Sequence, residues 1–171
     1  MFAPAGPNPT LEMLLGTLHA SDMPVSFSVS GAGPATPAEL ASSDWEAAFV
    51  RWEEPEVHDT WYLERGAVAT DEAAQTAVAA ACVWLNRSTD RDLQAELLPL
   101  LLAVNSVVTV AVMPAMTADD DHPAWDAFAD LVQVVAGACS GIAFAPDVGF
   151  YDSDGVLMGD VTVDATQEQT R

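Results

Sequence analysis

The sequence predicts an α+β fold, with a mostly antiparallel sheet of about five strands and three to four helices packed on it. Half of the 171 residues are hydrophobic, which is enough to bury one core. Two strand-like segments, 47–53 and 59–65, follow each other across a short loop, as the strands of an antiparallel hairpin do. Three longer segments, near 70–87, 90–104 and 123–139, carry apolar residues at helical spacing.

The chain is expected to have three parts. Residues 1–22 form a Pro-rich arm and a short amphipathic helix, residues 23–163 a single α+β domain, and residues 164–171 a polar tail. No internal repeat and no domain boundary interrupts the central part.

The short N-terminal helix is predicted from one apolar stripe that follows the arm over 1–9. Thr10 is the expected N-cap, and the stripe consists of Leu11, Leu14, Leu15 and Leu18. Because Met23 and Pro24 separate this helix from the following segment, we expect it to dock loosely or to contact a partner.

Strand patterns follow this helix. Residues 25–29 alternate between apolar and polar side chains, which predicts a half-buried strand. The Gly- and Pro-rich segment 31–37 ends that strand, and Pro37 begins a short helix that extends through Ala41. The loop of the hairpin that comes next is acidic and is interrupted by Pro55.

The segment near 70–87 gives the strongest helical pattern. Thr70 is its expected cap, and Asp71 and Glu72 lie in the first turn, where the helix dipole favours anions. Its predicted buried stripe consists of Ala74, Val78, Ala81 and Leu85.

A second helix begins near Asp90, and Pro99 is expected to kink or restart it. The side chains expected to point inward are Leu93, Leu97, Leu100, Leu101 and Val104. The next segment, 106–112, is almost continuously apolar, which predicts a central strand buried on both faces.

A third long helix is predicted to begin near Pro123 and to end at Gly141. Its apolar stripe consists of Trp125, Phe128, Val132, Val135 and Cys139. Short strands are expected after it, separated by turn residues, at 142–145, 150–151 and 156–158.

Residues 139–155 contain a helix ending in Gly, a strand, Pro146-Asp147 with Gly149, an aromatic residue, and the turn Asp152–Gly155. This segment resembles a C-terminal pattern found in small bacterial proteins of unknown function. The resemblance covers about a tenth of the chain and implies architecture, not activity.

The charge is strongly one-sided, with 26 Asp and Glu against 5 Arg and no Lys, for a net charge of -21. This composition argues against direct binding of nucleic acid and against a polybasic attraction to membranes. Three causes could explain this composition: codon bias in a GC-rich genome, a saline host, or a carboxylate surface that imitates the phosphates of DNA. Whatever its cause, the negative charge steers the chain toward basic partners.

Residues 97–118 carry no charge and are long enough to span a bilayer. A Leu-rich first part and a β-branched second part, separated by Asn105, favour a buried helix followed by a buried strand. Cys82 and Cys139 are too few for a disulfide framework and are expected to be buried free thiols, which favours a cytoplasmic location.

The best candidate metal ligands are His122, Asp126 and Asp130, which recur at i, i+4 and i+8 after the acidic run 119–121. One imidazole with several carboxylates suits a hard or borderline divalent ion. The alternative is an acidic helix start that complements the dipole and continues as a solvated face, and we favour this alternative. No cofactor is predicted.

Two weaker motifs have structural alternatives. Gly137-Ala-Cys-Ser-Gly141 has the letters of a nucleophile elbow, but the predicted helix precedes Cys139 instead of following it. Gly31-Ala-Gly33 follows a strand as a dinucleotide loop does, but Thr36 stands where the third glycine belongs.

Four aromatic residues gather around the predicted hairpin: Trp45, Trp52, Trp61 and Tyr62. Core filling is the simpler interpretation. The alternative is a partner-binding surface, because Trp and Tyr are favoured anchors at interfaces.

These observations favour a non-enzymatic, cytoplasmic protein-interaction module of inhibitor or immunity type, with a basic protein as its partner. A metal-dependent hydrolase that uses the cluster Asp119–Asp130 is one alternative. A DNA-mimicking decoy of a nucleic-acid-binding protein is another. The sequence leaves the oligomeric state and the identity of the partner open.

Overall fold

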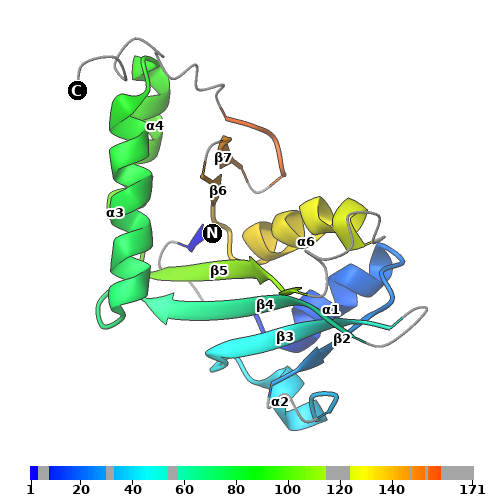
Figure 1. Cartoon of the computed structure of the whole chain (residues 1–171). Helices are drawn as coiled ribbons and strands as arrows, with labels where there is room; N and C mark the ends of the chain where they lie inside the picture. Colours follow the sequence, from blue (N-terminus) through cyan, green and yellow to red (C-terminus); the bar gives the residue numbers. More distant parts are fainter. Residues whose placement is uncertain are drawn as a thin grey trace.

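The computed structural model describes residues 1–3, 8–29, 33–53, 58–114, 124–146, 148–152 and 154–158. The fold is α+β with an antiparallel five-stranded sheet, as predicted, and it has in addition a separate two-stranded hairpin (Figure 1). The predictions for His122, for the acidic run before it and for the polar tail lie outside the described residues.

The large sheet has the strand order β1-β5-β4-β3-β2. In that order the strands are Phe2–Ala3, Ser106–Val112, His58–Ala67, Ala47–Trp52 and Val25–Ser28. The predicted hairpin is confirmed, because β3 and β4 pair antiparallel with Phe49 opposite Tyr62. A register shift between Val50 and Arg51 bends this pair.

Strand β5 is not the central strand that its apolar run predicts. β4 occupies the centre, and the outer neighbour of β5 is β1, which pairs only with Ser106 and Val107. Val107 and Val108 are buried, but Thr109 and Ala111 are exposed. The run is apolar because adjacent residues serve two separate clusters, with Val108 in one and Val107 in the other.

The first three residues are part of the sheet, which corrects the expected mobile arm at these positions. Phe2 pairs with Val107 and also bridges Ile142 on its other side. The Phe2 N–H donates to the Ile142 carbonyl at 2.8 Å, and the Ile142 N–H donates back at 3.1 Å. Strand β1 therefore joins the large sheet to the start of the small hairpin.

Helix α1, Leu11–Ala20, begins at the predicted N-cap, where Thr10 Oγ1 accepts a hydrogen bond from the Met13 N–H at 3.1 Å. The expectation of loose docking is wrong, because Leu11, Leu14 and Leu18 are completely buried. The Trp45 indole also donates to the Pro9 carbonyl at 2.8 Å and fixes the chain just before the helix.

Helices α3, Glu72–Arg87, and α4, Arg91–Leu102, form an antiparallel pair at one end of the sheet (Figure 1). Asp71 caps α3, one residue after the predicted Thr70, and Asp90 caps α4 as predicted. Each aspartate accepts hydrogen bonds from the N–H groups of its first turn.

Two details of α4 differ from the prediction. The helix runs through Pro99 without restarting, and Leu100 is 46% exposed instead of pointing inward. The inward stripe of Leu93, Leu97 and Leu101 already fills the face toward α3.

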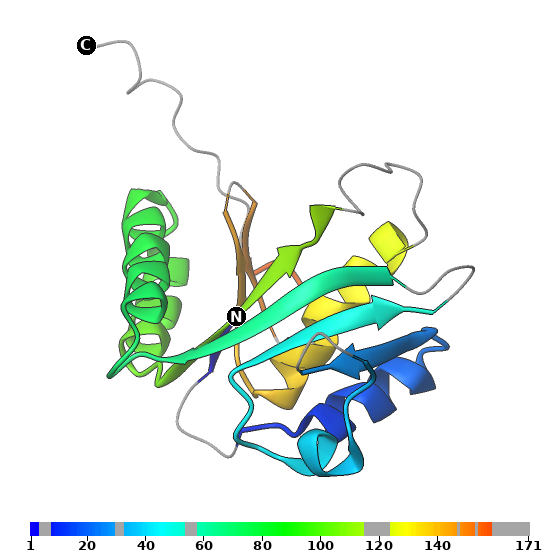
Figure 2. The ribbon, with the colours of Figure 1, turned by 60° about the horizontal axis from the view of Figure 1, so that its bottom comes forward.

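Helix α6, Ala124–Ala138, packs beside α1 on one face of the sheet (Figure 2). The predicted stripe of Trp125, Phe128, Val132, Val135 and Cys139 is confirmed only in part, because Val135 is completely buried but Trp125, Phe128 and Cys139 are partly buried at the margin of the core. The rest of the buried face is the adjacent line of Ala124, Ala127 and Leu131. Ser140, with φ 48°, takes the left-handed position after the helix that Gly141 was expected to mark.

Gly141 serves a different purpose, because a Cβ there would run into the Phe2 carbonyl oxygen. A glycine thus permits the close approach of this segment to β1.

The core has two parts. The first lies between the sheet and α1 with α6, and it holds Trp45, Trp52 and Trp61. The second lies between α3, α4 and the hairpin of β6, Ala143–Ala145, and β7, Gly149–Tyr151. In the second part Trp84 contacts Phe144 and Phe150, with ring centroids 5.5 and 5.3 Å apart.

The outer edge of β2 is covered by the segment that leads to α2, Pro37–Ala41. The Ala35 N–H donates to the Phe27 carbonyl at 2.7 Å, and a capping box between Thr36 and Glu39 begins the helix. At the other end of the fold, the predicted turn at Asp152–Gly155 is present, and Gly155 has the expected positive φ of 77°.

Candidate functional site

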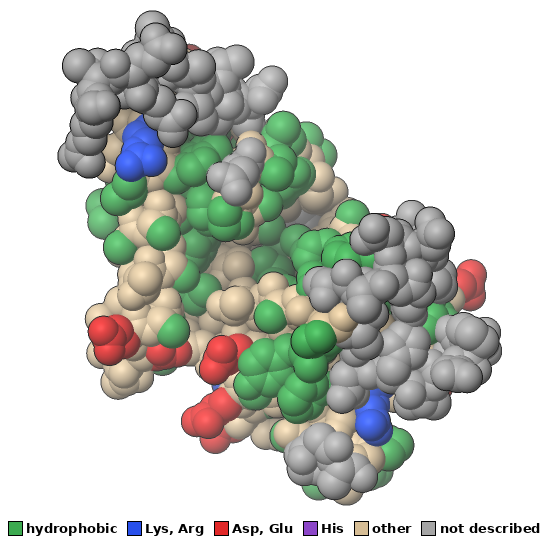
Figure 3. Space-filling view, viewed as in Figure 1, with side chains coloured by type: hydrophobic (Ala, Val, Ile, Leu, Met, Phe, Trp, Pro, Cys, Tyr) green, Lys and Arg blue, Asp and Glu red, His purple; other side chains and the backbone are tan. Residues whose placement is uncertain are grey.

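A cavity of about 650 Å³ opens where β5, α6 and the β6–β7 hairpin meet. Figure 3 shows this region as a hollow at the centre of the molecule, with hydrophobic side chains on its walls. Its volume lies in the range of small-molecule and peptide-side-chain pockets.

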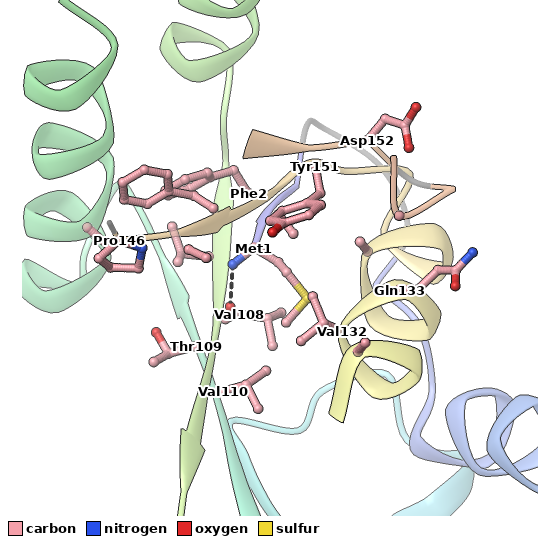
Figure 4. Close-up of a pocket in the computed structure, with 18 of the residues that line it drawn as sticks. Met1, Phe2, Val108, Thr109, Val110, Val132, Gln133, Pro146, Tyr151 and Asp152 are labelled. Carbon is pink, nitrogen blue, oxygen red and sulfur yellow. Dashed lines mark hydrogen bonds between the residues drawn. The ribbon is translucent and has the colours of Figure 1, made fainter. Parts of the chain in front are cut away.

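The apolar wall of the cavity comes from α6 and β5. Val132, which was predicted to be core, lines the cavity opposite Val108 and Val110 (Figure 4). Phe128 lines the cavity as well, although it also packs, partly buried, against the first part of the core. The open space exists because small side chains line much of the remaining wall: Ala77, Ala80, Ala129, Ala136, Ala143 and Ala145.

The polar groups near the cavity include the amino group of Met1, which donates a hydrogen bond to the Val108 carbonyl at 2.7 Å. Burial lowers the pKa of this amino group from 8.0 to about 6, so it is mostly uncharged at neutral pH. The Tyr151 side chain extends over Met1 (Figure 4).

Two other polar side chains at the rim are engaged in the turn that follows β7. Gln133 Nε2 donates to the Asp154 carbonyl at 2.8 Å. Asp152 Oδ1 accepts from the N–H groups of Asp154 and Val156, each at 2.9 Å. Figure 4 shows both side chains directed away from the apolar wall, so that wall is essentially uncharged.

A second surface feature is the sheet face opposite α1 and α6, which we call the open face. It includes two cross-strand rows, Phe49–Tyr62–Ala111 and Ala47–Glu64–Thr109, and Arg51, opposite Ser26, lies on the same face. The rings of Phe49 and Tyr62 lie 5.0 Å apart and are half-buried, and Glu64 beside them is exposed. Figure 3 shows the hydrophobic side chains as a patch over β3 and β4.

The predicted aromatic surface is corrected by these positions. Trp45, Trp52 and Trp61 are only 3%, 7% and 0% exposed and fill the first core, while Tyr62 lies on the open face. The alternation of the strands explains the split, because Trp61 and Tyr62 are neighbours that point to opposite faces. Phe49, the cross-strand partner of Tyr62, was not among the predicted surface residues.

The predicted metal ligands fall only partly within the described residues. Asp126 and Asp130 lie on α6, where Asp130 is exposed, and His122 lies outside the described chain. In the described ranges there is no group of three or more residues able to hold a metal ion. The metal site therefore stays a prediction.

The structure describes the first weaker motif fully, but Gly31 and Ala32 of the second lie outside the described residues. Cys139 follows the last turn of α6, and burial raises the pKa of its thiol, which opposes a reactive thiolate. At the other motif, the carboxylate of Glu39 accepts hydrogen bonds from the N–H and hydroxyl of Thr36, so this helix start is occupied by its own side chains. The strands on either side, β2 and β3, are antiparallel, unlike those of a dinucleotide fold.

The uncharged segment 97–118 is a helix that ends at Leu102 followed by β5, as far as the structure describes it. Within the described ranges, none of the helices is long and apolar enough to cross a membrane.

Comparisons of the chain with protein-family models, with curated proteins and with solved structures gave no match.

Proposed function

We propose that this protein is a protein-interaction module that binds a basic partner through the open face. The observation that carries the proposal is the half-exposed pair of Phe49 and Tyr62 at the centre of that face, beside the exposed carboxylate of Glu64. Buried aromatic anchors surrounded by polar groups are typical of binding hot spots.

The charge favours a basic partner. A net charge of -21 attracts cationic surfaces and speeds their encounter, while it repels other acidic proteins. An inhibitor or immunity-type role fits this combination of size, charge and an aromatic patch. A DNA-mimicking decoy fits less well, because its recognition face needs rows of carboxylates, whereas one row of the open face is Phe49–Tyr62–Ala111.

The test is quantitative affinity purification from the native host with three forms of the protein. They are the natural chain, the double variant Phe49→Ala/Tyr62→Ala, and the control Leu102→Ala, which removes a side chain that is 75% exposed on α4. The recovered proteins are then purified, and their binding is measured by calorimetry at several salt concentrations.

We expect at least one basic protein to bind the natural chain and the control equally. Its affinity should fall at least about thirtyfold for the double variant, as for a hot spot worth about 2 kcal/mol, and should weaken with salt. Equal binding to all three forms, or binding only of acidic or neutral proteins, would refute the proposal. A partner whose binding is competed by DNA would support the decoy role instead.

A further inference from the structure

The outer edge of β5 is only partly paired. Met1 and Val108 exchange two backbone hydrogen bonds, at 2.7 and 2.9 Å. In an antiparallel ladder, groups that face one side recur at every second residue, so the backbone of Val110 faces the same edge. The backbone groups of the alternate residues face β4 instead. For example, the Met113 N–H donates a hydrogen bond to the Thr60 carbonyl at 2.9 Å. Within the described chain, Val110 has no backbone hydrogen bond on its outer side.

This edge borders the cavity. Val110 lines the cavity together with Phe128 and Val132, which face it from α6. Met1 shows how an apolar residue paired with this edge is accommodated, because its thioether lies between Val108 and Val132 (Figure 4). A residue paired with Val110 would place its side chain on the same face, toward α6.

We propose that the cavity and the β5 edge together bind an extended peptide segment. The segment pairs antiparallel with β5 at Val110, in the direction that β1 already follows, and inserts an apolar side chain between Val110 and Val132. Main-chain hydrogen bonds supply affinity in this mode, and the side-chain pocket supplies specificity.

Three features support an uncharged apolar side chain as the occupant of the cavity. The wall formed by β5 and α6 is apolar, and the charged side chain at the rim, Asp152, is held in its own turn. The alanines of α3 and α6 leave room for a side chain of Leu or Phe size. Of the residues in the two rows of the open face, only Thr109 also lines the cavity, so the inference does not depend on the proposed function.

The first test is a selection of random hexapeptides displayed on phage against the whole protein. The variant Ala129→Trp fills the cavity from an exposed position of α6, and Asp130→Trp is its control, because residue 130 is exposed beside it but does not line the cavity. We expect enriched peptides with apolar residues at alternate positions. Their affinity should fall at least about tenfold for Ala129→Trp and stay unchanged for Asp130→Trp.

The second test separates strand pairing from simple burial. N-methylation of the peptide amides that face β5 should weaken binding by at least about tenfold, while methylation of the alternate amides should not. Val110→Pro removes the outer N–H, which β4 does not use, and should have the same effect. Peptide binding should also slow hydrogen exchange at the Val110 N–H.

The proposal is overturned if the natural protein enriches no peptide more strongly than the Ala129→Trp variant does. It is also overturned if both methylation patterns weaken peptide binding equally. Binding of the uncharged dye Nile red to the cavity without any peptide binding would also overturn it, and would assign the cavity to small apolar molecules.

Discussion

The two parts of the core are built in different ways. The first is filled by large side chains from neighbouring strands and from α1 and α6, and Trp61, Leu11, Leu14 and Leu18 are completely buried in it. The second joins segments far apart in the chain, namely Phe2, the α3–α4 pair and the β6–β7 hairpin. Its tryptophan, Trp84, is only half-buried. The cavity lies where these two parts meet, so incomplete packing coincides with the candidate site.

The largest expected difference comes from removing one tryptophan from each part. Trp61→Ala should lower the free energy of unfolding by about 3–5 kcal/mol, because it leaves a large hole in a closed region. Trp84→Ala should cost about 1–2 kcal/mol, because its ring is already partly in water. Urea unfolding of both variants measures the difference.

A companion variant, Trp61→Phe, sharpens this comparison. Within the described residues the Trp61 Nε1–H is buried without a hydrogen-bond partner, so its removal relieves a polar group that is costly to bury. Trp61→Phe should therefore cost much less than Trp61→Ala. Equal costs at Trp61 and Trp84 would mean that the two parts are packed equally well.

The next effect concerns the connection between the two parts. Gly141→Ala should destabilise the protein by about 1–3 kcal/mol, because the added methyl group collides with the backbone of Phe2. Hydrogen exchange should become faster at the N–H groups of Phe2 and Ile142, which bond each other's carbonyls. Gly16→Ala is the control, since nothing lies within 4 Å of its new Cβ in helix α1, and it should stabilise the protein slightly. If Gly141→Ala leaves the free energy of unfolding unchanged, the contact between Gly141 and Phe2 does not contribute to the stability of the connection between the two parts.

A feature of either part could be predicted from the sequence when the residues that form it lie close together in the chain. The strand patterns of 47–53 and 59–65 predict the β3–β4 hairpin, and polar capping residues predict where α3 and α4 begin to within one residue, because these features involve neighbours in the chain. The pairing of Phe2 with residues 107 and 142 has no local signature, so neither β1 nor the edge position of β5 was predicted.

The candidate site was missed for a related reason. Two adjacent faces of α6 are apolar, the line that contains Leu131 and the line that contains Val132. Hydrophobic periodicity indicates a buried face but does not distinguish a packed core from a cavity wall. The aromatic surface was predicted in part, because Tyr62 faces outward but the three tryptophans do not.

A smaller effect tests whether charge repulsion acts on both parts together. Since carboxylates greatly outnumber arginines, we expect the melting temperature to rise between about 0.01 and 1 M NaCl, as screening relieves repulsion in the compact state. Thermal unfolding should show a single transition that shifts to higher temperature, because repulsion acts on both parts together. Sucrose at matched concentration is the control for general exclusion effects. A flat or falling melting temperature would indicate that specific ion pairs dominate.

The smallest effect is confined to α2, at the margin of the first part. Hydrogen bonds from Thr36 lower the pKa of Glu39 below its ordinary 4.5, so this contact stabilises the folded state above that pH and is lost as the pH falls through the lowered pKa. Glu39→Gln should therefore slightly weaken the helix at pH 6 and make no difference in strong acid. Hydrogen exchange at the Glu39 and Leu40 N–H groups measures this weakening of the helix. Equal effects of the substitution at both pH values would contradict the role of the Glu39 carboxylate.

The place of Phe2 between Val107 and Ile142 has a consequence for synthesis of the chain. Its second neighbour leaves the ribosome about 140 residues after Phe2 itself, on the order of ten seconds later at ordinary translation rates. Until then the N-terminal strand lacks one of its two neighbours, and the apolar residues of the second part of the core have no completed surface to join. The second part of the core therefore cannot be completed before residue 142 and the β6–β7 hairpin that follows it have been synthesised.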